Sequence, residues 1–171
     1  MQTDSWKAAF WRLLKASEVA TRMAAPFLSL KVGGNARAEC RRQFSEAKDL
    51  VVSGRLAAII HELENVRGRA SHREIAGNLA LLVQAFPYPP KTNLTSYGQQ
   101  LMEDVCFREP SLFALYATCG ELRRKSRFLP AIGDVISTID EYEKVLAHRI
   151  QNLRRLPAAI ADFETKQRDA V

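Results

Sequence analysis

The sequence predicts an all-α protein of about six helices, a helical bundle that ends in a long C-terminal helix. Two observations lead to this prediction. Apolar residues recur at three- and four-residue steps along most of the chain, which is the period of a helix buried on one face. No segment alternates apolar and polar residues over the length of a strand, so we expect no sheet.

The first 70 residues are predicted to form a basic helical region, because most of the chain's excess of Lys and Arg lies there. An apolar stripe over residues 6–27 indicates the first helix, and Gly33-Gly34 forms a break after it. A second helix is expected over residues 36–66, with a kink or a split at Gly54.

Residues 71–130 are predicted to form a module of three helices. Ser71 and Glu74 have the spacing of a capping box, which starts the first of them, and a run of prolines ends it. The next helix spans about Leu94 to Arg108. Pro110 suits the first turn of the last one, where its missing N–H costs nothing. We expect one set of side chains to be buried together: Leu79, Leu82, Leu101, Val105, Leu115 and Leu122.

Residues 131–171 are predicted to form one long helix with a heptad repeat. The seam of this repeat consists of Ile132, Ile139, Leu146 and Leu153. Two interpretations stay open: the seam packs on the N-terminal helices of a monomer, or it pairs with a second chain in a coiled-coil homodimer. Arg149 and Pro157 interrupt the pattern, which favours the monomer slightly. Pro157 should also kink the helix or end it near Leu156.

The composition is that of a globular protein. The 171 residues suit one domain of ordinary size, with 47% hydrophobic and 26% charged residues. A net charge of +6 allows nucleic acid or an acidic protein as a partner. Three cysteines without a CxxC pair indicate reduced thiols in a cytoplasmic protein. We expect no membrane association, since no apolar run is long enough to span a membrane. We expect no secretion signal, since the N-terminus carries alternating charges and lacks a basic segment followed by an apolar one.

The sequence carries no arrangement that predicts catalysis. His61, His72 and His148 are scattered and lack Cys or carboxylate neighbours at the spacing of a metal site. Gly33-Gly34 lacks the further Gly, the Lys and the Ser or Thr of a phosphate-binding loop, and no nucleophile lies in a recognisable elbow. We therefore expect no enzyme activity, no metal and no cofactor.

One concentrated charge motif lies at the predicted C-terminal end of the helix that Pro110 opens. It consists of Arg123, Arg124, Lys125 and Arg127. These cations can offset the negative end of the helix dipole, or they can bind nucleic acid or an acidic partner. Phe128 and Leu129 follow, and we expect both to fill the core between two helices.

The motifs of residues 75–138 resemble those of a known family. Leu81–Pro87 ends in Phe-Pro, a helix opens at Pro110, and Arg127–Val135 reads Arg-Phe-Leu-Pro-Ala-Ile-Gly-Asp-Val. This arrangement resembles the N-terminal domain of the phage replicative-helicase loader/inhibitor family, and similar segments occur in uncharacterised phage and prophage proteins of α-proteobacteria. The resemblance implies a role in DNA replication, with a replicative helicase or an initiator as the protein partner.

Two functions from different classes follow. The first is a non-catalytic interaction protein of phage or prophage DNA replication. The second is a small basic regulator that binds nucleic acid directly. They differ in the salt dependence of DNA binding, because contacts to phosphates weaken steeply as the salt concentration rises.

Overall fold

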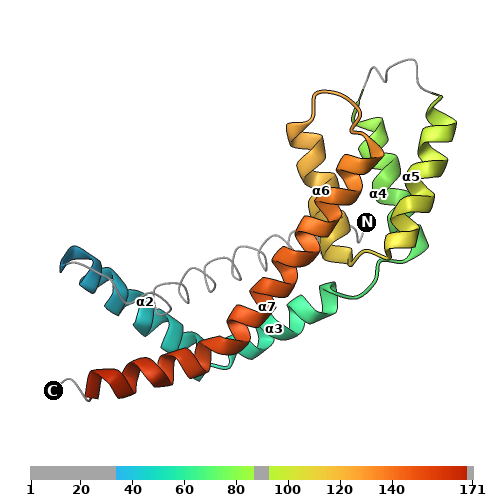
Figure 1. Ribbon diagram of the computed structural model, residues 1–171. Coiled ribbons are helices and arrows are strands. Elements are labelled where there is room, and N and C mark those ends of the chain that lie inside the picture. Colours follow the sequence, from blue (N-terminus) through green and yellow to red (C-terminus); the bar gives the residue numbers. More distant parts are fainter. Residues whose placement is uncertain (1–33, 87–92, 169–171) are drawn as a thin grey trace. The chain divides into compact units, whose positions relative to one another are not determined.

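The computed structural model describes residues 34–86 and 93–168, and within these ranges it contains six helices and no strand (Figure 1). The helices are α2 (Gly34–Val52), α3 (Arg55–Val66), α4 (His72–Gln84), α5 (Leu94–Arg108), α6 (Leu112–Lys125) and α7 (Ile132–Arg168). The predicted all-α class with a long C-terminal helix is confirmed. The helix predicted over residues 6–27 lies outside the described residues.

The chain divides into two compact units. One is the unit Asn65–Ala147, and the other comprises, of the residues that the structure describes, 34–64 and the part of α7 from His148 onward. The predicted division into 1–70, 71–130 and 131–171 follows the order of the sequence, whereas the compact units do not. The difference arises because α7 contributes its first part to one unit and its remaining part to the other.

Local capping signals set the helix starts in the unit Asn65–Ala147. The Ser71 hydroxyl accepts a hydrogen bond from the Glu74 N–H, and the Glu74 carboxylate accepts one from the Ser71 N–H at 2.8 Å, which completes the expected capping box. Asn93 caps α5 by accepting from two backbone N–H groups of the first turn. The bounds of α5 agree with the prediction.

Helix α6 begins at Leu112, two residues after the proline that was predicted to lie in its first turn. Pro110 does not lie in the first turn, because Ser111 is the N-cap and its hydroxyl accepts from the Ala114 N–H at 3.1 Å. Pro110 precedes the cap and is buried, and its carbonyl accepts from the Ala70 N–H at 2.8 Å. A proline that precedes the N-cap removes no N–H group from the helix itself.

Two left-handed residues mark helix boundaries. Gly54, with φ of +72°, separates α2 from α3, so the expected irregularity in this segment is a split between two helices. Glu109 ends α5 with φ of 47°, a conformation that is uncommon for a residue with a side chain.

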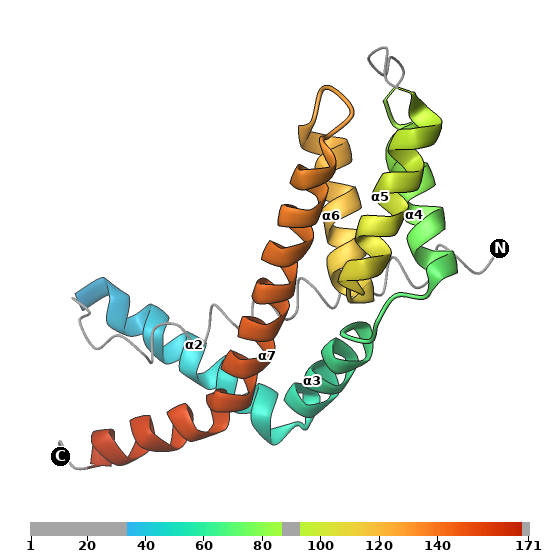
Figure 2. The same ribbon diagram turned by 45° about the vertical axis from the view of Figure 1, so that its right-hand side comes forward.

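The core of the unit Asn65–Ala147 is built from α4, α5, α6 and the first part of α7. All six side chains predicted to be buried there are buried: Leu79, Leu82, Leu101, Val105, Leu115 and Leu122. Phe113 on α6 and Ile139 on α7 are also buried, and the ring of Phe113 meets that of Tyr142 edge to face at 6.0 Å. Figure 2 shows α4, α5 and α6 side by side in this unit.

Helix α7 does not end at Leu156 but continues through Pro157 to Arg168. A proline inside a helix lacks the N–H for the bond to the residue four positions earlier, and its ring crowds that carbonyl. Pro157 therefore lies inside the helix, and its ring is expected to bend α7 at this position. Among the described residues, no helix is long and apolar enough to cross a membrane.

Replacing Leu115 by Ala should lower the free energy of unfolding by about 2–5 kcal/mol, because the side chain is fully buried and the deletion leaves a cavity. Leu81 on α4 is 49% exposed, and Leu81→Ala should change stability by no more than about 0.5 kcal/mol. Urea unfolding of both variants measures the difference. Equal losses from the two substitutions would contradict the assigned core.

Candidate functional site

The candidate site is the C-terminal end of α6 with the loop that follows, residues Arg123–Phe128, here called the basic end. Its cations are Arg123, Arg124, Lys125 and Arg127. The first three form the last turn of α6. Ser126 leaves the helical conformation, and its N–H donates to the Leu122 carbonyl at 2.9 Å. The structure thus places all four predicted cations at one helix end.

The four cations are all exposed, but they differ in their local contacts. The Nε of Arg123 donates to the Cys119 carbonyl at 3.1 Å. The Nζ of Lys125 lies 2.8 Å from the Glu121 carboxylate. Arg127 makes no hydrogen bond or ion pair with any residue that the structure describes. The loop cation is therefore the one most open to a binding partner.

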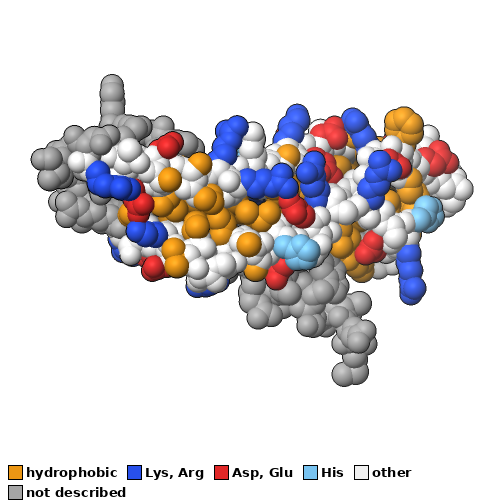
Figure 3. Space-filling model, turned by 90° about the horizontal axis from the view of Figure 1, so that it is seen from below, with side chains coloured by type: hydrophobic (Ala, Val, Ile, Leu, Met, Phe, Trp, Pro, Cys, Tyr) orange, Lys and Arg blue, Asp and Glu red, His pale blue; other side chains and the backbone are white. Residues whose placement is uncertain are grey.

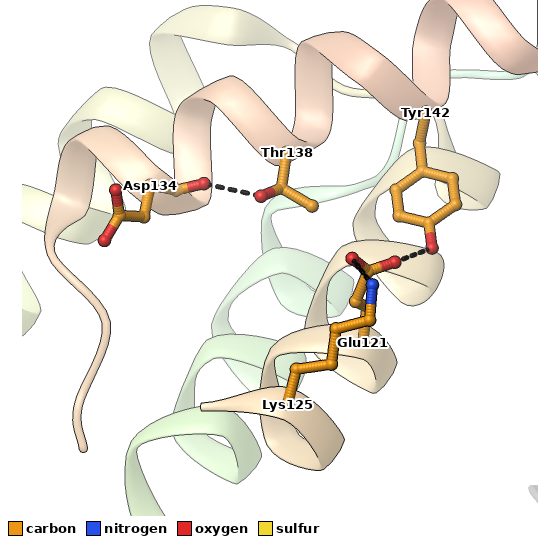
Figure 4. A network of polar contacts seen from close by, with 5 residues as sticks. All are labelled: Glu121, Lys125, Asp134, Thr138 and Tyr142. Carbon is orange, nitrogen blue, oxygen red and sulfur yellow. Dashed lines mark hydrogen bonds and ion pairs between the residues drawn. The ribbon is translucent and has the colours of Figure 1, made fainter. Parts of the chain in front are cut away.

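Glu121 joins the end of α6 to α7. Its carboxylate accepts hydrogen bonds from the Lys125 ammonium and from the Tyr142 hydroxyl (Figure 4). The bond from Lys125 and then the bond from Tyr142 lower the pKa of the Glu121 carboxyl below its ordinary value. Lys125 thus holds an acidic group in place as well as contributing to the positive charge of the basic end.

Phe128 does not fill the core as predicted, because its side chain is 74% exposed. Leu129 is half-buried, and Pro130 is buried. The hydroxyl of Tyr97, from α5, donates to the Pro130 carbonyl at 2.7 Å. Tyr97 and Pro130 thus occupy the interior at this end of the unit, and Phe128 is left outside.

Burial, followed by the negative charge of Asp134, raises the pKa of the Tyr97 hydroxyl. The hydroxyl therefore remains a hydrogen-bond donor to Pro130 over a wider pH range than a free phenol would.

The seam residues of α7 are turned inward within the single chain. Ile139, Leu146 and Leu153 are buried, and Ile132 at the first position is half-buried. In the unit that contains His148–Val171, the rings of Phe44 and Phe163 lie 4.9 Å apart and join α2 to α7. Three of the four seam side chains are therefore buried within the single chain, as expected if the seam packs inside a monomer.

The cysteines and histidines form no reactive centre among the described residues. Cys119 is buried, and burial raises the pKa of its thiol to about 12, so it stays protonated. His61, His72 and His148 are exposed. No group of three side chains suited to a metal ion occurs in the part of the chain that the structure describes.

A shallow open pocket lies beside the start of α4 and the end of α5. Its polar lining includes Arg69, His72, Cys106 and Glu109. The guanidinium of Arg69 is 2.6 Å from the Glu109 carboxylate, so the two charges in the pocket already satisfy each other. This arrangement supports no specific chemistry.

Hydrophobic side chains gather in one area of the face seen in Figure 3, and Lys and Arg side chains lie along its borders. An apolar area with a charged border is typical of a surface that binds another macromolecule.

No protein-family model matches the chain, and no curated protein or solved structure matches it.

Replacing Tyr142 by Phe should destabilise the protein near neutral pH, because Glu121 loses one of the bonds that lower its pKa. A lowered pKa contributes stability above the ordinary value of 4.5, and this contribution is lost as the pH falls through the lowered value. The difference in the free energy of unfolding between wild type and variant should therefore become smaller on acidification, as measured by urea unfolding at about pH 7 and about pH 3. When both proteins also carry Glu121→Gln, this difference in the free energy of unfolding should not depend on pH. A pH-dependent difference between those two proteins would contradict the assignment.

Sedimentation of the full chain should give the mass of a monomer over a wide range of protein concentrations, because the seam of α7 is buried within one chain. The melting temperature should likewise be independent of concentration. A mass that rises to twice that of the monomer would show that the chain self-associates.

Proposed function

We propose that the protein is a non-catalytic interaction protein that contacts nucleic acid through the basic end. The observation that carries this proposal is the placement of four exposed cations within one helix turn and the adjoining loop. Phosphates attract such a cluster, and each contact releases counterions that were condensed on the nucleic acid. The net charge of +6 acts in the same direction at longer range.

The dipole of α6 does not account for the whole cluster. Cations in the last turn of a helix interact favourably with its negative end, and this explains Arg123, Arg124 and Lys125. Arg127 lies two positions beyond the last helical residue, and Phe128 beside it is exposed. An exposed cation and an exposed aromatic residue at consecutive positions of a loop are more typical of a binding surface than of a cap.

The resemblance of residues 75–138 to the phage helicase loader/inhibitor family supplies the biological setting of this proposal. In that setting the protein acts in the cytoplasm during phage or prophage DNA replication, and its protein partner is a replicative helicase or an initiator. The apolar area of Figure 3 is compatible with such a partner. The basic end would then bring the protein to the nucleic acid on which the partner works.

Charge reversal at Arg124 and Arg127 tests the contact. Lys125 is not substituted, because its partner Glu121 also bonds Tyr142 of α7. Arg124→Glu with Arg127→Glu should weaken binding to fluorescent DNA at low salt. It should also reduce the slope of log affinity against log salt by about two, one per phosphate contact.

The matched control is Arg73→Glu with Lys144→Glu, which changes the net charge equally at two exposed positions of the same unit. It should leave the salt slope nearly unchanged. Equal effects of both pairs would mean that only the overall charge matters. Absence of DNA binding by the wild type at low salt would overturn the nucleic-acid contact.

A further inference from the structure

Phe128 is exposed although the chain around it is held in place. Two residues before it, the Ser126 N–H bonds the end of α6, and two residues after it, the Pro130 carbonyl accepts the Tyr97 hydroxyl. Leu129 between these points is half-buried. The Phe128 ring is therefore exposed on a loop that is anchored on both sides of it.

An exposed phenylalanine has one part that can interact strongly, namely its ring face. The side chain has no polar group, and nearly three quarters of it is in contact with solvent. A ring in this position gains most from a flat apolar surface that can lie against it. Nucleobases have such a surface, and each base presents it without regard to sequence.

The charges around Phe128 favour a nucleotide over an acidic protein surface. Arg127 is its direct neighbour, and the three cations of the last α6 turn lie just before it. The acidic residues nearest to it in the sequence are Glu121, which is bound to Lys125 and Tyr142, and Asp134, which lies in the first turn of α7. A nucleotide carries a base and a phosphate in one repeating unit, so an aromatic ring beside a cation matches it.

We infer that the basic end binds single-stranded nucleic acid, with Phe128 stacked on an unpaired base and Arg127 in contact with a neighbouring phosphate. This inference rests on the proposed function, and it adds the kind of nucleic acid that is bound. In a duplex the faces of the bases are already stacked on one another, so Phe128 can reach one only where the strand is unpaired.

Replacing Phe128 by Ala in the full chain tests the inference. The affinity for a fluorescent single-stranded oligothymidine should fall on the order of tenfold, the usual effect of removing one stacked aromatic ring. The affinity for a duplex of equal length should stay within about twofold, because phosphate contacts dominate there. Phe128→Trp should retain the single-strand affinity, since indole also stacks.

Phe107→Ala is the matched control. Phe107 is 89% exposed and belongs to the same unit, but its neighbouring cation, Arg108, is already paired with Asp140 at 2.9 Å. Its removal should not affect either affinity. Circular dichroism and the urea midpoint should be unchanged in both Ala variants, because neither ring is packed in the core.

The outcomes separate this inference from the proposed function. If Arg124→Glu with Arg127→Glu weakens binding and Phe128→Ala does not, the basic end contacts phosphates only, and the stacking inference is wrong. The inference is also wrong if Phe128→Ala weakens single-strand and duplex binding equally. If the charge reversal has no more effect than its control, the proposed contact itself fails.

Discussion

A buried hydrogen bond from the Tyr97 hydroxyl to the Pro130 carbonyl, 2.7 Å long, fixes the end of the unit that carries the basic end. Each group would be costly to bury alone, and each satisfies the other. The bond joins α5 to the loop between α6 and α7, which are far from it in sequence. Because Pro130 is held inside by this bond, the loop residues before it run along the surface, and Phe128 points outward.

Helix α7 is held by polar contacts spaced along its apolar stripe. In the unit Asn65–Ala147, Asp140 pairs with Arg108 at 2.9 Å, and the Glu143 carboxylate accepts from the Ser111 N–H at 2.6 Å. In the other unit, Glu164 lies 2.6 Å from Lys48. The two exposed ion pairs contribute little stability by themselves, but all three contacts fix which turn of α7 meets which neighbour. A heptad seam does not by itself distinguish packing within a chain from a coiled coil, since both need the same stripe.

The features that could be predicted from sequence are those set by local chemistry. The capping box at Ser71 and the split at Gly54 depend on neighbouring residues, and the six buried leucine and valine side chains follow from helical period. The exposure of Phe128 could not be predicted, because the bond that holds the nearby Pro130 inside comes from Tyr97, 33 positions earlier in the sequence. The contact of Lys125 with Glu121 was available from their i,i+4 spacing, but the Tyr142 hydroxyl on the same carboxylate was not.

The cations of the basic end differ in how freely they can bind a partner, because some of them already make contacts within the protein. Arg123 bonds a carbonyl of its own helix, and Lys125 bonds an acidic side chain, so both stabilise the end of α6 whether or not a partner is present. A phosphate that approaches them must compete with those contacts. Arg127 makes no such contact with any described residue. It also lies two positions beyond the last helical residue, whereas the effect of the helix dipole is confined to the last turn. The cations of α6 itself should therefore contribute less to binding than their number suggests. Most of the free energy of binding should come from the loop, where Arg127 and Phe128 are consecutive residues.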